Sequence, residues 1–228
     1  MTAQIDHLVI AASTLEEGVA WCERTLGITP GPGGEHPLMG THNRLFSIAT
    51  AQYPTAYLEI IAIDSGAVFA PKYGENRWFD LDHVALQHQL QKTGPQLIHF
   101  VVSTLLAATA VQALTVLGIE RGELLSASRA TPQGLLSWQI TVRHDGQRLM
   151  YGTLPTLIEW GKVHPTQHMT PSGVTLQSLT ASLPNTDQLR SAYAAIHLQG
   201  VGVAQGQPNL IATLQTKRDL VTLESKGL

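Results

Sequence analysis

The stretch IDHLVIAASTLEEGVAWCERTLG spans residues 5–27 of the 228-residue chain. Its first third is an apolar, strand-like stretch, and Ser13 with Glu16 three residues later forms a capping-box pattern. The apolar residues that follow at the spacing of one helical face are Leu15, Val19, Cys22 and Leu26. Gly27 stands where a helix usually ends. This segment therefore predicts a strand followed by a helix.

The same arrangement occurs twice more along the chain. Residues 97–118 and 176–200 again show an apolar strand, a cap signal, a helical apolar stripe and a terminal glycine. Each copy is followed by strand-like stretches rich in β-branched and large apolar residues, at 43–50, 56–63, 135–144, 156–162, 210–217 and 219–225. The repeated unit is therefore interpreted as βαβββ, which makes the chain an α+β protein.

The repeats also predict the organisation of the chain. A first domain is expected over 1–163, made of modules 1–74 and 95–163 with a helical insertion at 75–94. A third, degenerate module is expected over 174–228, packed on the first two, after a turn-rich linker.

Composition restricts the classes of function. Hydrophobic residues make up 43% of the chain and charged residues 14%, which excludes a disordered tail. The net charge of −3, without a basic run, argues against nucleic acid as a partner. The single cysteine, the lack of a signal-peptide pattern and the lack of a long apolar run indicate a cytoplasmic protein without membrane association. A small molecule is the expected partner, and both monomer and homodimer remain open.

Superposition of the first two units aligns four residues that carry chemistry. His7 and His99 coincide on the first strand, and Glu59 and Glu159 coincide on the last strand. An ionised carboxylate inside an apolar strand must be paired, protonated or bound to a metal. Two imidazoles and two carboxylates suit one divalent cation. Taken alone, each of these residues is more often an ordinary core or surface residue than a metal ligand, so the hypothesis depends on all four coinciding.

These residues lie in segments that resemble the vicinal oxygen chelate superfamily, and within it the glyoxalase-like domain proteins, a fold shared with bleomycin resistance proteins and dihydroxybiphenyl dioxygenases. The resemblance rests on DHLVIA (6–11), HPLMGTHNRLFSI (36–48), YLEIIAI (57–63), IHFVV (98–102) and LIEW (157–160). It implies that paired βαβββ modules form curved mixed sheets with helices outside, around a metal cleft.

The resemblance also implies roles for individual residues. It assigns His7, Glu59, His99 and Glu159 as ligands of a divalent ion, with Ni, Zn, Mn and Fe all open. Substrate contacts are expected from the GTHNR segment and its surroundings, namely from Thr41, Asn43, Arg44 and His36.

The function expected from this set is that of a metal-dependent lyase or isomerase. A small molecule with hydroxy or oxo groups on neighbouring carbons would chelate the ion and react through an enediolate. Glu159 is the first candidate for the catalytic base and Glu59 the second.

Two other classes of function remain open. An extradiol-type dioxygenase would use two histidines and one carboxylate on iron, although a fourth anionic ligand would occupy a position that dioxygen needs. A non-catalytic protein that sequesters a small molecule would have an aromatic cleft. The candidates to line such a cleft are Trp21, Trp78, Trp138 and Trp160.

Overall fold

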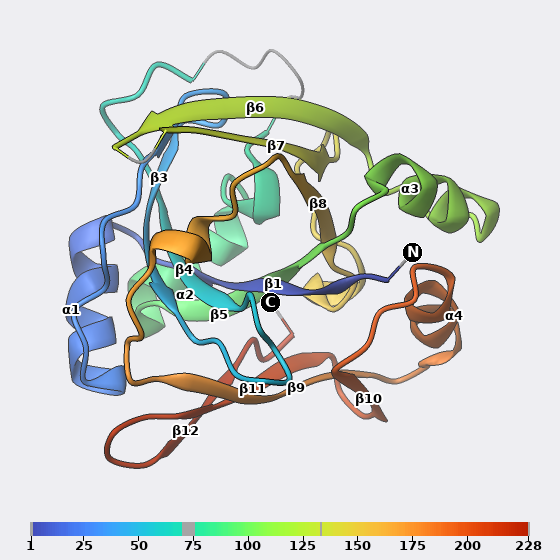
Figure 1. Cartoon of the computed structure of the whole chain (residues 1–228). Helices are drawn as coiled ribbons and strands as arrows, with labels where there is room; N and C mark the ends of the chain where they lie inside the picture. The colour runs from blue at the N-terminus through green and yellow to red at the C-terminus, as the bar shows by residue number, and fades with distance from the viewer. Residues whose placement is uncertain (1, 70–75, 133, 228) are drawn as a thin grey trace.

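The computed structural model of the chain describes residues 2–69, 76–132 and 134–227. These residues form an eight-stranded sheet that curls over itself and a separate four-stranded sheet beneath it (Figure 1). The helices of the three repeated units lie outside the curl, as the sequence predicts for this fold class. None of the helices within the described ranges is long and apolar enough to cross a membrane.

The first module follows the predicted order of elements. It consists of β1 (Gln4–Ala11), α1 (Leu15–Leu26), β2 (Glu35–His36), β3 (Thr41–Ser47) and β4 (Tyr57–Ile63). The cap of α1 differs from the expected one by one residue, because the Thr14 hydroxyl, not Ser13, accepts the Glu17 backbone N–H at 3.2 Å. Gly27 ends the helix with φ of 73°, a conformation that glycine adopts without strain.

The second module mirrors the first across the middle of the sheet. It consists of β5 (Gln96–Ser103), α3 (Ala107–Val116), β6 (Glu123–Thr131), β7 (Gly134–Val142) and β8 (Thr156–Trp160). The strand order is β2-β3-β4-β1-β5-β8-β7-β6, with β1 and β5 antiparallel at the centre. His7 pairs with Val101 and His99 pairs with Val9, so the two histidines occupy equivalent positions in the two modules, as the repeat predicts.

A bulge in β1 changes which side chains face the inside of the curl. Ile5 pairs with Val102 and His7 with Val101, which leaves Asp6 as an extra residue. Side chains otherwise alternate, so that Leu8 packs in the outer core and Val9 in the inner one. The bulge allows Asp6 and His7, although adjacent, both to contact groups on the inside.

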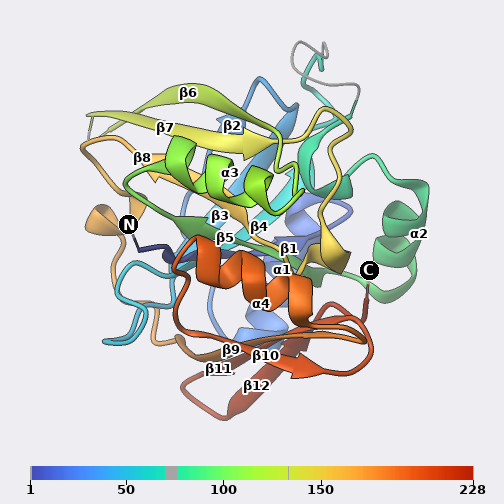
Figure 2. The same ribbon diagram turned by 90° about the vertical axis from the view of Figure 1, so that its right-hand side faces the viewer.

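The third unit has the expected βαβββ order but a different arrangement of strands. It contains β9 (Thr175–Leu183), α4 (Asp187–Ala195), β10 (Val201–Gln205), β11 (Asn209–Gln215) and β12 (Leu220–Glu224). Its strand order is β10-β9-β11-β12, whereas in the other modules the first strand lies next to the fourth. Its apolar face shares one core with the outside of the curled sheet, and α4 lies beside α3 (Figure 2).

The segment between the modules carries a 3₁₀ turn and a helix, η1 (Trp78–Asp80) and α2 (Val84–Thr93). The expected boundary at residues 74 and 75 lies outside the described residues. An ion pair of 2.9 Å between Asp80 and Arg148 ties η1 to the turn before η2 (Met150–Gly152). Phe79 is held at φ of 61°, which is strained for an aromatic residue. The insertion therefore holds Trp78 and Phe79 against the inner face of the sheet.

Gly18 sets how closely α1 approaches β4. A Cβ at this position would lie 2.3 Å from Ile60 Cγ2 and 3.2 Å from the Ala12 Cβ. Glycine to alanine inside a helix normally gains about 1 kcal/mol, whereas forcing a methyl into a packed core costs about 1–3 kcal/mol. The difference between the two effects is a net loss, so we expect Gly18→Ala to lower the free energy of unfolding by up to about 2 kcal/mol in urea denaturation. An increase in stability would show that the helix moves away at little cost.

Candidate functional site

A narrow pocket lies on the inside of the curl, between residues of both modules. Asn43, Tyr57 and Glu59 line it from β3 and β4. Arg129, Trp138 and Trp160 line it from β6, β7 and β8. The space open to water inside is about 40 Å³, enough for only a few water molecules or a small reacting group. The pocket continues into a wider outer groove of about 850 Å³.

Glu59 is the carboxylate of this pocket. It is 5% exposed and lies opposite Val9 of β1. Its Oε1 accepts a 2.6 Å hydrogen bond from Asn43 Nδ2. The Asn43 Oδ1 accepts the Gly34 backbone N–H at 2.9 Å, which fixes the orientation of the amide. A Cβ on Gly33 would lie 1.9 Å from the Asn43 backbone oxygen, so only glycine at this position allows the two segments to lie so close together.

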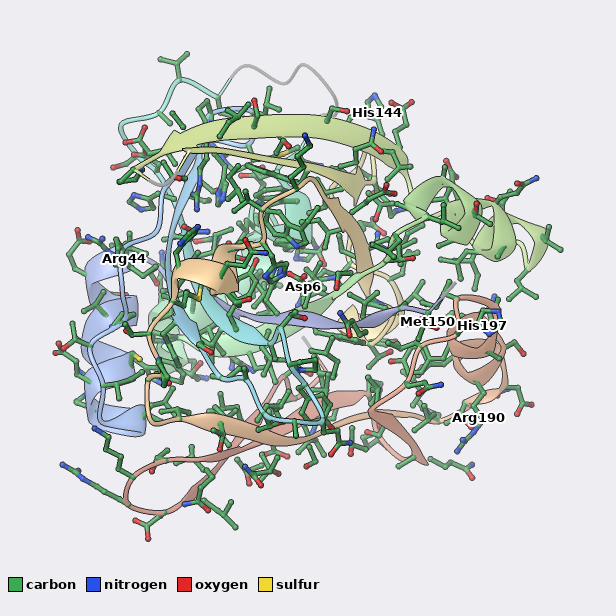
Figure 3. All side chains as sticks on the ribbon, in the orientation of Figure 1. Asp6, Arg44, His144, Met150, Arg190 and His197 are labelled. Carbon is green, nitrogen blue, oxygen red and sulfur yellow. The ribbon has the colours of Figure 1, made fainter. Side chains whose placement is uncertain are left out.

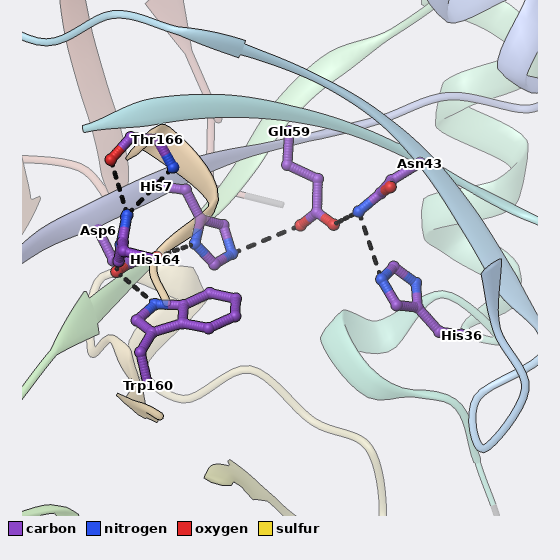
Figure 4. A network of polar contacts seen from close by, with 8 residues as sticks. All are labelled: Asp6, His7, His36, Asn43, Glu59, Trp160, His164 and Thr166. Carbon is purple, nitrogen blue, oxygen red and sulfur yellow. Dashed lines mark hydrogen bonds and ion pairs between the residues drawn. The ribbon is translucent and has the colours of Figure 1, made fainter. Parts of the chain in front are cut away.

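His7 lies beside Glu59 and connects it to a second carboxylate (Figure 4). Its Nδ1 is 2.7 Å from Asp6 Oδ1, and its Nε2 is 3.5 Å from Glu59 Oε2. Because an ionised carboxylate only accepts hydrogen bonds, Nδ1 carries the hydrogen. The ring stacks on Tyr57 with 4.6 Å between centroids. His7 therefore presents Nε2 to Glu59 in a fixed orientation.

Asp6 is completely buried and receives hydrogen bonds from three side chains. Besides His7, its Oδ2 accepts from Trp160 Nε1 at 2.8 Å and His164 Nε2 at 2.9 Å. Burial alone would raise its pKa, but the hydrogen bonds from His164 and His7 outweigh that effect and hold the pKa well below the usual range. Asp6 is therefore an ionised anchor that orients both histidines.

His36 and Thr41 support the pocket from β2 and β3. Asn43 Nδ2 donates to His36 Nε2 at 3.3 Å, and His36 Nδ1 lies 3.0 Å from Thr41 Oγ1. Burial and the nearby positive charge of Arg129 lower the pKa of His36 to about 3. Three of the four expected substrate-contact residues thus belong to one network, in which His36 and Asn43 line the pocket.

The fourth, Arg44, does not belong to it. Its side chain is exposed and lies beside α1 on the outside of the sheet (Figure 3). Successive strand residues face opposite sides, so a neighbour of the inward-facing Asn43 faces outward. The expectation that Arg44 contacts substrate is therefore corrected.

His99 lies outside the pocket, and both of its ring nitrogens are engaged. Nδ1 donates to the Gly152 carbonyl at 2.9 Å, and Nε2 accepts the Thr156 backbone N–H at 3.2 Å. The Phe79 ring, which lines the pocket, packs against it with 5.3 Å between centroids. Burial and the charges of Arg121 and Arg148 hold its pKa well below the usual range. His99 is thus a neutral residue that positions the start of β8.

Glu159 faces the other side of the sheet. Its neighbours Ile158 and Trp160 line the pocket, whereas its own Oε2 accepts the Ala107 backbone N–H at 2.8 Å. It therefore caps the N-terminus of α3. The residue equivalent to Glu59 is Thr156, because Thr156 pairs with Val101 as Glu59 pairs with Val9. The alignment of the two glutamates was wrong by three positions.

The predicted divalent ion does not fit this donor set. The structure brings His7 and Glu59 together, but not His99 or Glu159. His99 has no lone pair left for a metal, and Glu159 is on the wrong face. Within the described ranges, no group of three or more His, Cys, Asp or Glu side chains is arranged to hold a metal ion.

Several residues of the pocket carried no recognised signal in the sequence. These are Phe79 and Arg129, which line the pocket, and Asp6 and His164, which belong to the hydrogen-bond network behind it. Asp6 does interrupt an apolar strand directly before His7. Trp78, Trp138 and Trp160 do line the pocket, whereas Trp21 packs against the outer core.

Paired βαβββ modules around an inner cleft define the vicinal oxygen chelate fold. The chain belongs to the glyoxalase-like domain family, whose sequence model matches residues 5–197. No curated protein shows significant sequence similarity.

Solved structures are similar to the chain at low identity. A hypothetical protein from Staphylococcus aureus is 15% identical, with a TM-score of 0.61 over 97% of this chain and 85% of that one. The methylmalonyl-CoA epimerase of Streptomyces coelicolor is 17% identical, with a TM-score of 0.42 over 70% and 98%. The Mycobacterium tuberculosis epimerase is 14% identical, with a TM-score of 0.39 over 68% and 85%.

The capping role of Glu159 is testable by stability. We expect Glu159→Ala to lower the free energy of unfolding by about 1 kcal/mol, because α3 has no cap from its own first turn. Glu159→Gln, which can still accept the Ala107 N–H, should lose less than half of that. Equal losses from the two variants in urea denaturation would contradict the capping role.

The buried neutral histidine predicts a pH dependence of stability. The folded pKa of His99 lies below its unfolded value of about 6.5, so at lower pH the unfolded state binds a proton that the folded state does not. Stability should therefore fall as the pH falls below about 6.5, by up to about 1.4 kcal/mol per pH unit for this residue. His99→Gln should flatten the decrease between about pH 6.5 and 4.5, whereas His88→Gln, on the exposed side of α2, should not. An unchanged slope in His99→Gln would show that this residue is not the source.

Proposed function

We propose that the protein is an enzyme of the isomerase or lyase type, which moves a proton at a carbon next to a carbonyl group of a small oxygenated molecule. The observation that carries the proposal is the position of Glu59, a buried carboxylate inside a pocket that is otherwise largely apolar and aromatic. Buried carboxylates that line a pocket are frequent general bases.

The two oxygens of Glu59 have different roles in the proposed reaction. Oε1 is held by Asn43 at 2.6 Å, whereas Oε2 has no closer polar partner within the described ranges than His7 Nε2 at 3.5 Å. Oε2 therefore keeps a lone pair for the substrate proton. When it takes the proton, the C–H electron pair forms a C=C bond and the carbonyl π electrons move to oxygen, which gives an enolate.

The fate of the enolate decides between the two types of enzyme. Return of the proton to the opposite face of the carbon, or to a neighbouring carbon, gives an isomer. Loss of a leaving group from the adjacent carbon gives a lyase product. His7 Nε2, which Asp6 orients through Nδ1, is placed to exchange a proton with Glu59 between turnovers.

The proposal includes no metal step, because the donor set does not fit a four-ligand centre. The dioxygenase alternative needs iron held by two histidines and a carboxylate, and the engagement of His99 removes one of them. Neither the expected enediolate on a metal nor ring cleavage is therefore proposed.

A second candidate is binding without chemistry. Trp78, Trp138 and Trp160 surround the pocket, and flat aromatic walls bind small molecules well. In that case the Glu59 carboxylate would favour a ligand that carries a hydrogen-bond donor.

The test is deuterium exchange at carbon. The wild-type protein is incubated in D₂O with a panel of small 2-oxo, 2-hydroxy and hydroxycarbonyl compounds, and loss of the C–H signal is followed by NMR. We expect exchange with at least one compound, slowed at least about 100-fold in Glu59→Gln. The rate of deuterium exchange should not change when metals are removed by a chelator.

Glu159→Gln is the matched control, since it removes a carboxylate charge from the other face of the sheet. It should exchange at the wild-type rate. Equal rates in wild type and Glu59→Gln would contradict the assignment of the base. Tight binding of a compound with no exchange would favour sequestration.

A further inference from the structure

Two hydrogen-bond donors in the pocket have no partner among the described residues. Arg129 Nη1 and Trp78 Nε1 are buried, and neither has a hydrogen-bond partner in the part of the chain that the structure describes. Leaving a buried donor unpaired is costly, and it costs more for a charged group. Both residues line the same pocket as Glu59. The two donors are therefore available to a ligand.

The surroundings of Arg129 make room for its guanidinium. A Cβ on Gly34 would lie 2.0 Å from Nη1, so glycine at this position allows the side chain to lie against the β2 hairpin. No carboxylate within the described ranges forms an ion pair with it, whereas Arg77, Arg143 and Arg148 each pair with an aspartate. Arg129 thus keeps an uncompensated positive charge in the cleft.

Arg129 also lies at a junction. Together with Leu45, Leu136 and Pro165, it lines both the inner pocket and the outer groove. A carboxylate bound to Arg129 would lie where the groove meets the inner pocket, with the carbon that carries it directed towards Glu59. The inner pocket has room only for a small molecule.

We infer that Arg129 and Trp78 form a carboxylate subsite, and that the substrate is a 2-oxo acid whose carboxylate binds there. The inference deepens the proposed function and rests on it for the reaction. Guanidinium groups bind carboxylates through paired N–H···O contacts, and an indole N–H supplies one further donor.

The charge of the pocket favours this class of substrate. Glu59 repels an anion in the pocket, so a bound carboxylate needs the positive charge of Arg129, which forms no ion pair within the described ranges. In a 2-oxo acid, the ketone at carbon 2 acidifies the hydrogens on carbon 3. Glu59 takes one of these protons, and the ketone oxygen receives the electron pair next to the donors that hold the carboxylate.

The subsite is tested by binding, independently of turnover. Calorimetry with 2-oxobutanoate as the anionic probe is compared with its neutral methyl ester. Wild type should bind the acid at least about tenfold more tightly than the ester. Arg129→Gln should lose at least about tenfold in affinity for the acid and little for the ester. Trp78→Phe, which keeps an aromatic ring but removes the N–H, should lose affinity for the acid to a smaller extent.

Arg44→Gln is the matched control, because it removes an arginine from the exposed side of β3, and it should bind both probes as wild type does. Unfolding midpoints of all variants establish that they are folded. Equal affinity of wild type for acid and ester, no binding of the acid, or unchanged binding in Arg129→Gln would overturn the subsite.

Deuterium exchange at carbon 3 separates this inference from the proposed function. Acid-selective binding that depends on Arg129, without exchange by any compound, supports the subsite and contradicts the enzyme. Exchange of neutral hydroxycarbonyl compounds, without acid-selective binding, supports the enzyme and overturns the subsite.

Discussion

Two buried carboxylates, Asp6 and Glu59, determine how the inside of the curled sheet is built. An ionised carboxylate without partners in an apolar interior costs more than the roughly 5–15 kcal/mol that stabilises a domain, so each must receive hydrogen bonds. Asn43 donates to Glu59, and Trp160 and His164 donate to Asp6. These donors come from β3, β8 and the linker after it. Hydrogen bonding to the two carboxylates therefore brings segments from distant parts of the chain together on the inside of the curl.

The fold could be predicted from the sequence because its signals are local and repeated. Strand, helix and terminal glycine recur three times, and the equivalence of His7 and His99 follows from that repeat. The bulge at Asp6 could not be predicted, because a bulge is defined by the partner strand and not by its own residues. The same limit explains why Glu159 does not align with Glu59 as the sequence predicts. Residue type suggested its alignment with Glu59, but pairing with β5 sets the register of β8 and puts Thr156 there.

The two modules are symmetric in backbone but not in chemistry. In the second module, His99 and Thr156 stand at the positions that correspond to His7 and Glu59. A buried Arg121 lies next to them and donates to Thr156 and to the Pro155 carbonyl. Burial lowers the pKa of Arg121 to about 9, and burial also keeps His99 neutral. Among the described residues of this module, no aspartate or glutamate is buried to act as a base. Its polar groups bond to one another and to the backbone, which stabilises the strand end. The charged groups that can move a proton are thus confined to the first module, and the second supplies walls and Arg129.

The linker between β8 and the third unit connects that unit to the pocket. His164 donates a hydrogen bond to Asp6, Pro165 lines both the pocket and the groove, and Ser172 donates to the Ser47 carbonyl of β3. The linker thus runs from the second module to the first along the edge of the cleft. The four-stranded sheet shares a core with the outside of β1 and β4, so it holds the far end of the linker in place. Although none of its described residues lines the pocket, the third unit thereby supports the linker that forms this edge of the cleft.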